Sequence, residues 1–374
     1  MTHEKAPPSS AASSTAPTRV PVVLIGCGAV AQQFYIPTFR AAVRDGAIEV
    51  AALVDPSTAA RGLLARAFPK ARQADTLEQV ELPAGALAVI ASPPRFHAAQ
   101  TQAAFQCGWH VLCEKPMASS AAECAAMVAA AEAAQRLLAV GLYKRFFPSS
   151  RYLHSLVRQG HLGALRHFTV SEGGPFRWPA ATPSFFNKTQ TPGGVLLDIG
   201  VHVLDLLLWW FGEPERFQYA DDAMGGLETN VHLTLQYTGG ATGNVHLSRD
   251  WKTPNQYRFE FERGVVTWTT NDANGLTVQL KGLPAALHSQ LVTPIEEVRP
   301  TAPLPLATNP QSFIYQLLNV VSAIRGQEPL LVDGREGMRS LTLIENCYRN
   351  RTLVEQPWLT ATEAARAQHL ASQP

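Results

Sequence analysis

The sequence predicts an α/β chain with two domains, the first built on a doubly wound parallel sheet and the second an α+β domain with a large, mostly antiparallel, open sheet. Its length of 374 residues exceeds what a single hydrophobic core usually fills. Apolar, strand-like runs alternate with helix-like segments up to about residue 143, a pattern typical of parallel sheets. Beyond that point short strands follow one another with few helices between them, which is typical of antiparallel sheets.

The first elements form a strand, a tight turn and a helix. Residues 20–25 are an apolar, β-branched run, and apolar positions recur at helical spacing over residues 30–43. A second apolar run, residues 48–54, ends at Asp55, and Ser57 is placed to cap the helix that follows. This order is a βαβ unit, which requires parallel strands joined by a right-handed crossover.

The remaining elements repeat this alternation and then depart from it. In the first domain we expect further strands at residues 87–91, 110–113 and 137–142, and helices at about residues 96–107 and after Ser119 or Ser120. The second domain is predicted to contain strands at residues 169–172, 231–237, 242–248, 257–262, 265–269 and 276–280, followed by helices at residues 311–324 and 334–350.

These elements set the expected domain bounds. Residues 1–19 are rich in Ala, Ser, Thr and Pro without an apolar run, so we expect a disordered tail. Residues 20–143 then form the first domain, 144–350 the second and 351–374 a C-terminal tail, with the last helices free to pack back on the first domain. The most apolar stretch, residues 196–211, is too short to span a bilayer and contains three ionisable residues. We therefore expect a cytoplasmic protein with no membrane partner.

Charge and cysteine content exclude several classes of function. Lys and Arg number 31 against 30 Asp and Glu, so the chain lacks the basic field of a nucleic-acid binder, and no nucleic-acid partner is expected. The five cysteines form no C-x-x-C pair, as expected for free thiols in a reducing compartment. The histidines lack a spaced set of carboxylates or thiolates, so we expect no metal site.

A glycine-rich turn after the first strand predicts a dinucleotide site. Residues 26–31 read G-C-G-A-V-A, in which Gly26 permits a tight turn and Gly28 lets the backbone approach a pyrophosphate. A bare glycine pattern is weak, but here it lies between a strand and a helix, as in a Rossmann domain. Asp55 ends the second strand, where a carboxylate accepts hydrogen bonds from the adenosine ribose and repels a 2′-phosphate. The prediction is NAD rather than NADP, although Arg61 leaves some room for the phosphorylated cofactor.

Three further segments carry a family resemblance. They are residues 91–97 (ASPPRFH), residues 107–116 (CGWHVLCEKP) and residues 193–202 (GGVLLDIGVH). Together with the glycine turn, they resemble the glucose-fructose oxidoreductase / inositol dehydrogenase / rhizopine catabolism family, Gfo/Idh/MocA. The resemblance extends from about residue 20 to residue 212 and more weakly to about residue 350.

The third segment contains two ionisable residues that invite a chemical interpretation. Asp198 and His202 are four residues apart, so in a regular helix they share one face. One interpretation is a core histidine hydrogen-bonded by Asp198, and the other is a reaction site, because the pKa of imidazole suits proton transfer near neutral pH. The resemblance implies the second: His202 as general acid/base, Asp198 orienting the imidazole and contacting substrate, and Lys115, aimed by the turn at Pro116, polarising the reacting oxygen.

Further residues are expected around these three. Those expected to bind the dinucleotide are Gly26, Gly28, Ala29, Val30, Asp55, Ser92, Pro93, His97, Glu114 and Lys115, with a structural role at a helix start as the alternative for His97. Those expected to bind substrate are Arg145, Arg177, Trp178, Asn187, Asp198 and His202, with Lys188 and Arg249 as additional pocket candidates.

The expected function is an NAD(H)-dependent oxidoreductase that acts on a secondary hydroxyl of a sugar, sugar acid, nucleotide sugar or cyclitol, or catalyses the reverse reduction. Two alternatives remain at this point. One is a glycosidase of the same family that retains NAD, and the other is a non-catalytic dinucleotide-binding sensor or regulator. In the resembling family the open face of the second-domain sheet often pairs with another subunit, so the resemblance also implies a homodimer or homotetramer formed through that sheet.

Overall fold

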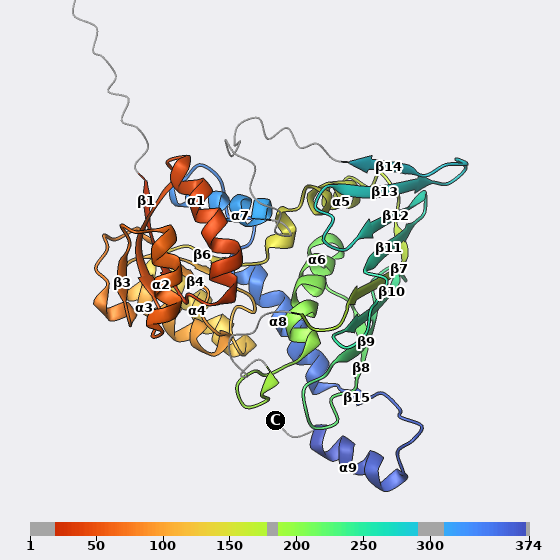
Figure 1. Cartoon of the computed structure of the whole chain (residues 1–374). Helices are drawn as coiled ribbons and strands as arrows, with labels where there is room; N and C mark the ends of the chain where they lie inside the picture. The colour runs from red at the N-terminus through yellow and green to blue at the C-terminus, as the bar shows by residue number, and fades with distance from the viewer. Residues whose placement is uncertain (1–18, 178–185, 291–309, 372–374) are drawn as a thin grey trace, which may run out of the picture.

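A computed structural model describes residues 19–177, 186–290 and 310–371, and it contains two sheets (Figure 1). The first is a six-stranded parallel sheet and the second a mixed, mostly antiparallel sheet of nine strands. The predicted fold class is therefore confirmed. Residues 1–18, most of the expected N-terminal tail, and Trp178 lie outside the described residues.

The parallel sheet has the strand order β3-β2-β1-β4-β5-β6. Successive strands are added on one side of β1 up to β3, and from β4 onward on its other side, so the order of addition reverses between β1 and β4. Ligands of doubly wound sheets bind at the carboxyl ends of the strands at such a reversal. The strands are β1 (Val20–Ile25), β2 (Ile48–Val54), β3 (Arg72–Ala74), β4 (Leu87–Ile90), β5 (His110–Cys113) and β6 (Leu138–Val140). The helices that flank them are η1 (Ala31–Tyr35, a π-helical turn), α1 (Ile36–Arg44), α2 (Thr58–Ala67), α3 (His97–Gln106) and α4 (Ala121–Ala134).

Serine caps begin two of these helices where the sequence predicts them. Ser57 Oγ accepts a hydrogen bond from Ala60 N at the start of α2, and Ser120 Oγ accepts one from Glu123 N at the start of α4, each at 3.2 Å. Each cap satisfies an amide that the first turn of a helix leaves without a partner. The caps fix where each helix starts, and so where the loops at the carboxyl edge of the sheet end.

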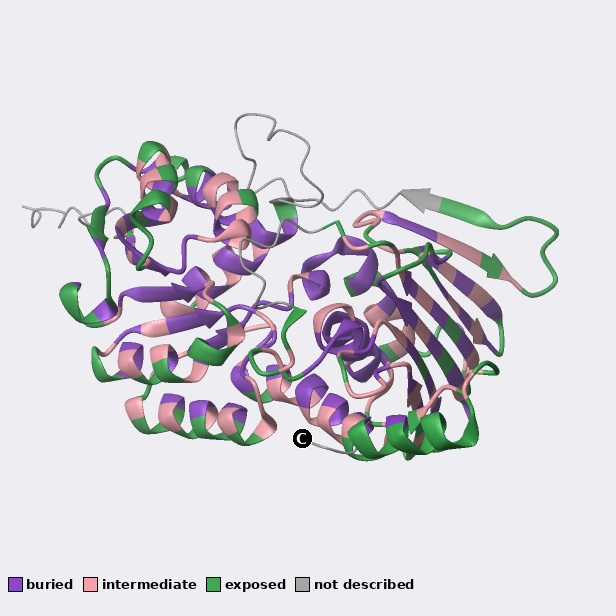
Figure 2. Cartoon of the chain, turned by 60° about the horizontal axis from the view of Figure 1, so that its bottom comes forward, coloured by how far each residue is buried: buried purple, intermediate pink, exposed green. Residues whose placement is uncertain are grey.

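The second sheet has the order β14-β13-β12-β11-β7-β10-β9-β8-β15. Its strands are β7 (Leu165–Gly173), β8 (Arg216–Asp221), β9 (Asn230–Gln236), β10 (Thr242–Ser248), β11 (Gln256–Phe261), β12 (Gly264–Thr269), β13 (Gly275–Leu280), β14 (Leu287–Gln290) and β15 (Thr352–Leu353). Two pairs, β7–β10 and β8–β15, are parallel, so the sheet is mixed. Buried and exposed residues alternate along its strands (Figure 2), as expected for a sheet with one covered and one open face.

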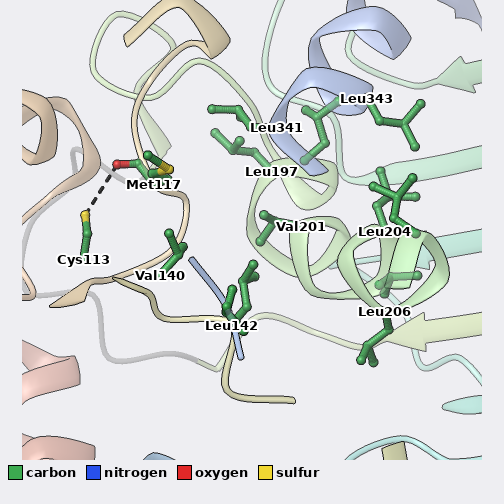
Figure 3. Packing of buried hydrophobic residues seen from close by; sticks show 14 of the residues in the cluster. Cys113, Met117, Val140, Leu142, Leu197, Val201, Leu204, Leu206, Leu341 and Leu343 are labelled. Carbon is green, nitrogen blue, oxygen red and sulfur yellow. Dashed lines mark hydrogen bonds between the residues drawn. The ribbon is translucent and has the colours of Figure 1, made fainter. Parts of the chain in front are cut away.

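Helices fill the space between the two sheets. They are α5 (Pro148–Arg158), η6 (Leu196–Gly200, a second π-helical turn), α6 (Val201–Phe211), α7 (Pro310–Ile324) and α8 (Gly334–Arg349). Helix α6 packs on α8, α8 also packs on α4, and α7 packs on α1. Leu197 and Val201 of the α6 segment, Leu341 of α8 and Leu142 after β6 belong to one buried cluster (Figure 3). The last long helices thus join both parts of the molecule, and we propose that they belong to the second domain.

The chain after residue 350 contains regular structure. Strand β15 extends the edge of the large sheet, and α9 (Ala361–Ala371) follows it in the segment expected to be a C-terminal tail. Short strands with two or three paired residues, such as β15 and β3, carry too little alternation to be recognised in a sequence. Within the described residues, no helix has both the length and the apolar character needed to cross a membrane.

Candidate active site

The glycine turn after β1 has the geometry that a pyrophosphate requires. Gly26 has a φ of +94°, and a Cβ on it would collide with the backbone of Ser92, so glycine is needed there. Gly28 faces open space, and nothing would meet a Cβ within 4 Å. The first helical turn, which contains Ala29 and Val30, begins here because Gln32 N donates to Gly28 O at 3.0 Å. A helix N-terminus beside an open glycine is a good binding site for phosphate.

Asp55 is held beside this turn by backbone amides. Its Oδ2 accepts a hydrogen bond from Cys27 N and its Oδ1 accepts one from Ser57 N, both at 2.8 Å. A carboxylate has about four acceptor positions, so lone pairs remain for the hydroxyls of a ribose. The position and chemistry of Asp55 therefore fit the adenosine end of a dinucleotide.

His97 joins two loops at the carboxyl edge of the parallel sheet. One ring nitrogen, Nε2, lies 2.8 Å from Ser92 O and the other, Nδ1, lies 3.0 Å from Pro116 O. Burial lowers the pKa of His97, and the backbone carbonyls only partly oppose this effect. A neutral imidazole has one N–H, so His97 donates to one of these two carbonyl oxygens and contacts the other, between the loop that carries Ser92 and Pro93 and the loop that carries Lys115.

Glu114 forms a second buried link, between the helix that follows the glycine turn and the loop that carries Lys115. Tyr35 of η1 donates its hydroxyl to Glu114 Oε1 at 2.7 Å, and Lys115 N donates to Glu114 Oε2 at 3.2 Å. Burial raises the pKa of Glu114 despite these hydrogen bonds. The side chain therefore connects the helix after the glycine turn to the loop that aims Lys115, and the Lys115–Pro116 bond in that loop is cis.

Lys115 and Asp198 meet across the two domains. Lys115 Nζ lies 3.0 Å from Asp198 Oδ1 and 3.1 Å from the Asp198 backbone oxygen. The other carboxylate oxygen, Oδ2, lies 2.9 Å from Arg249 Nη2. Burial raises the pKa of Asp198, but the two cations outweigh burial and the net pKa is lowered. Asp198 is therefore an ionised carboxylate bound to a cation through each oxygen.

His202 lies beside this ion cluster as a neutral imidazole. The residue is buried, and its Nδ1 has no hydrogen-bond partner in the part of the chain that the structure describes. Burial lowers its pKa well below 6.5, and the nearby charges of Lys115 and Lys144 lower it further. A neutral imidazole with an unpartnered nitrogen is suited to accept a proton.

The expected pairing of Asp198 with His202 is not the one the structure describes. The carboxylate of Asp198 is bound to Lys115 and Arg249 instead. Charge is the physical reason, because an ionised carboxylate interacts more strongly with two cations at 3.0 and 2.9 Å than with a neutral imidazole. The two side chains nevertheless stand on one continuous helical segment.

The turn after β6 contributes a residue that the sequence did not single out. Tyr143 begins the 3-10 helix η4 (Tyr143–Phe146), and its ring meets that of His202 edge-on at 5.0 Å between centroids and 75° between planes. On its other side the Tyr143 ring stacks on Phe313 of α7 at 4.8 Å. Burial raises the pKa of Tyr143, and the carboxylates of Glu172, Glu114 and Asp198 raise it further, so the phenol keeps its proton. An aromatic residue directly after a strand at the carboxyl edge was the available signal.

The other two side chains of this turn are held in buried ion pairs. Lys144 Nζ lies 2.7 Å from Glu172 Oε1 of β7, and Tyr257 donates its hydroxyl to the second oxygen of Glu172. Arg145, expected to bind substrate, lies 2.6 Å from Asp205 Oδ1 and 2.9 Å from Glu336 Oε2. Arg145 is buried between α6 and α8, where it contributes to packing of the helices rather than to the ion cluster.

The remaining substrate candidates lie on the segment before η6. Arg177 is exposed, and Asn187 accepts hydrogen bonds from the backbone and side chain of Thr189 within an exposed turn. The same turn approaches the first domain, where Arg95 Nη1 donates to Gln190 Oε1 at 3.0 Å. Of the expected substrate residues, the structure brings together Asp198 and His202 with Lys115 and the additional candidate Arg249.

A buried carboxylate fixes the start of the helix that carries Asp198 and His202. Glu228 Oε1 accepts hydrogen bonds from Gly194 N at 2.8 Å, Leu196 N at 3.1 Å and Tyr348 Oη at 2.7 Å. A Cβ on Gly194 would collide with the backbone oxygen of Glu228, and one on Gly193 would collide with the Tyr348 hydroxyl. The Gly-Gly pair is therefore required for this close approach, and Glu228 anchors η6 from the loop before β9.

Metal chemistry has no visible site in the described ranges. No group of three or more His, Cys, Asp or Glu residues within them is arranged to hold a metal ion. The five cysteines are free thiols, and all but Cys107 are buried.

Comparisons of the sequence with protein families and with known proteins agree on one family. The model of an oxidoreductase family with an NAD-binding Rossmann fold matches residues 20–142, and the GFO/IDH/MocA C-terminal domain matches residues 150–267. The chain is 31% identical to the rhizopine catabolism protein MocA of Rhizobium meliloti over 261 residues, which are 67% of this chain and 75% of that protein. It is also 31% identical to D-xylose 1-dehydrogenase (NADP(+)) 2 of Haloferax volcanii over 51% of this chain and 56% of that enzyme.

A solved structure agrees with this assignment over a longer span. The aldose-aldose oxidoreductase from Caulobacter crescentus superposes with a TM-score of 0.73 at 25% identity, covering 89% of this chain and 97% of that one. The similarity therefore includes both domains, whereas the match to the xylose dehydrogenase spans little more than half of that enzyme.

Proposed function

This chain belongs to the Gfo/Idh/MocA family of oxidoreductases, and from that premise we propose that it is an NAD(H)-dependent dehydrogenase of CH–OH groups. The substrate class is a polyhydroxylated molecule: a sugar, sugar acid, nucleotide sugar or cyclitol. The observation that carries the proposal is the Lys115–Asp198 ion pair across the two domains, with a buried neutral histidine beside it. Lys115 follows β5 at the carboxyl edge of the parallel sheet, where a bound nicotinamide is expected.

Three protein groups would share the proton and charge chemistry. When bound, the nicotinamide supplies the hydride acceptor or donor. His202, neutral and with an unpartnered nitrogen, takes the hydroxyl proton during oxidation and returns it during reduction. Lys115 donates a hydrogen bond to the reacting oxygen as charge develops on it. Asp198, ionised between two cations, holds the Lys115 ammonium in place and accepts a hydrogen bond from substrate.

The residues of the first domain fit NAD. Gly28 leaves room for a pyrophosphate at the helix N-terminus, and the Asp55 carboxylate is fixed where the adenosine ribose would lie. A carboxylate there repels the 2′-phosphate of NADP. We therefore propose that NAD(H) is the preferred cofactor, although a relative of this chain is an NADP(+) enzyme.

A spectrophotometric screen tests this function. Purified protein is mixed with NAD or NADP and with sugars, sugar acids and cyclitols, and the absorbance of the reduced nicotinamide is followed. We expect turnover of at least one polyol with NAD, and loss of turnover in Lys115→Ala and His202→Ala without loss of NADH binding. Binding of NADH with unchanged turnover in both variants would refute the catalytic assignment. Retained NAD with bond cleavage but no net NADH would instead indicate a glycosidase, and ligand binding without any turnover a sensor.

We further propose that the protein forms a homodimer or homotetramer through the outer face of the nine-stranded sheet. Helix α6 lies on the inner side of this sheet (Figure 1), and the outer side contains a hollow of about 440 Å³ lined by β7, β9 and β10. The rings of His232 and His246 stack there at 4.6 Å, and the exposed Trp251 lies 5.3 Å from His246. Light scattering of the wild type and of Thr234→Arg tests this: a monomeric wild type would rule it out.

A further inference from the structure

Arg61 lies beside the carboxylate on which the proposed cofactor preference depends. It stands on α2, where its Nη1 donates to the Asp55 backbone oxygen and its Nη2 donates to Thr58 Oγ1 at 3.2 Å. Its side chain is only 9% exposed. An arginine after the second strand of a Rossmann domain is the residue type that binds the 2′-phosphate of NADP. The chain thus places a phosphate-binding cation next to a carboxylate that disfavours phosphate.

A second carboxylate already binds this arginine. Asp75 directly follows β3, and its Oδ1 lies 2.5 Å from Arg61 Nη1. Parallel pairing of β2 with β3 brings Asp75 to this position, because Asp55 N donates to Ala74 O at 3.2 Å and the two strands end at the same edge. The Asp75 side chain is 61% exposed, so the carboxylate end of the ion pair is open to solvent at the edge where β2 and β3 both end.

We propose that Asp75 is a cofactor-specificity residue: its carboxylate binds Arg61 and withholds the guanidinium from the 2′-phosphate of NADP. The inference rests on the proposed binding of a dinucleotide at the Asp55 site and deepens it. Asp55 acts on the phosphate directly, through repulsion, whereas Asp75 acts through Arg61, by competing with the phosphate for the same donors. The two carboxylates oppose NADP by different routes, so their effects are coupled through one arginine.

This arrangement predicts a specific pattern in a double-mutant cycle. Asp55→Ser alone removes the repulsion but leaves Arg61 bound to Asp75. Asp75→Asn alone releases Arg61 but leaves the repulsion. Only the double variant offers both a guanidinium that no carboxylate neutralises and room for the phosphate, so the gain in NADPH affinity exceeds the product of the two single gains.

The experiment measures dissociation constants of NADH and NADPH by nicotinamide fluorescence for wild type, Asp55→Ser, Asp75→Asn and the double variant. In the Asp55→Ser background, Asp75→Asn is expected to lower the Kd of NADPH about tenfold, equivalent to about 1.4 kcal/mol, and to leave the Kd of NADH within about twofold. Adding Arg61→Gln should abolish this gain. Glu49→Gln removes one exposed charge from β2 and serves as the control. Thermal unfolding checks that each variant is folded.

The outcomes separate this inference from the proposed function. A Kd of NADPH that does not respond to Asp75→Asn in the Asp55→Ser background overturns the role of Asp75, and so does a gain that survives Arg61→Gln. Either result leaves NADH binding by the wild type, and hence the proposed function, intact. Failure of the wild type to bind either dinucleotide would instead overturn the proposed function.

Discussion

The ammonium of Lys115 and the carboxylate of Asp198 lie 3.0 Å apart although one follows the fifth strand of the parallel sheet and the other stands on a helix of the second domain. If Lys115 polarises the reacting oxygen, Lys115→Met should lower kcat by about 10²–10⁴-fold. NADH binding should weaken far less than kcat falls, because the glycine turn and Asp55 remain. Steady-state kinetics and NADH titration check this, with the exposed Lys70→Met as the control.

The pH dependence of oxidation should reflect the lowered pKa of His202. Only the neutral imidazole accepts a proton, and burial with the charges of Lys115 and Lys144 holds its pKa well below 6.5. The rate should therefore stay level as pH falls through 6.5 and decline only in more acidic solution. A profile of kcat/KM against pH measures this. A decline centred at the ordinary histidine value would contradict the assignment.

The same shift has a consequence for stability. Because the folded-state pKa of His202 is lowered, the unfolded chain binds the proton first as pH falls below 6.5. His202 therefore costs no stability above that pH and makes unfolding easier with acidification, until pH falls below the folded-state pKa. Urea unfolding of wild type and His202→Gln between pH 7 and 5 checks this, since the variant should lose part of the wild-type pH slope. Equal slopes would exclude the effect.

Tyr143 should act on His202 through its ring. Tyr143→Phe keeps the edge-on contact at 5.0 Å and should retain most activity, whereas Tyr143→Leu removes it and admits water beside the imidazole. We expect Tyr143→Leu to lower kcat about tenfold, a loss of roughly 1.4 kcal/mol, and to move the acid limb toward higher pH because burial of His202 is relieved. Phe147→Leu, which removes a ring touching Tyr143 but not His202, is the matched control. Equal losses of kcat in Tyr143→Phe and Tyr143→Leu would show that the hydroxyl of Tyr143, not its ring, matters.

Glu228 should be needed to hold the catalytic helix. Glu228→Ala leaves two buried backbone amides and the Tyr348 hydroxyl without their acceptor, and should lower the free energy of unfolding by about 1–3 kcal/mol or more. Tyr348→Phe removes one of the three hydrogen bonds and should cost less. Denaturant unfolding gives both values, and a larger loss in Tyr348→Phe than in Glu228→Ala would contradict the anchoring role.

Much of this architecture can be predicted from local sequence signals. The parts that could not be predicted are set by contacts between residues far apart in the sequence. The turn at Gly26, the carboxylate at Asp55 and the helix after Gly194 are local features, readable from residue type and spacing. By contrast, Arg145 finds partners 60 and 191 residues away, so sequence alone places its charge but not its role. Asp198 likewise binds Lys115 and Arg249, which are distant from it in the sequence, and no local signal predicts these partners.

The turn at Tyr143 gives three consecutive side chains three destinations: an aromatic contact with His202, an ion pair with the large sheet through Lys144, and an ion pair between two helices through Arg145. A 3-10 helix has three residues per turn, so neighbouring side chains point about a third of a circle apart. The contact that each of these side chains makes therefore depends on the number of residues that precede it in the turn. Removing one residue would place the Lys144 ammonium against the imidazole, and adding one would place the Tyr143 phenol against Glu172. A substitution at Tyr143 changes one of these contacts, whereas an insertion or deletion there would change the contacts of Tyr143, Lys144 and Arg145 together.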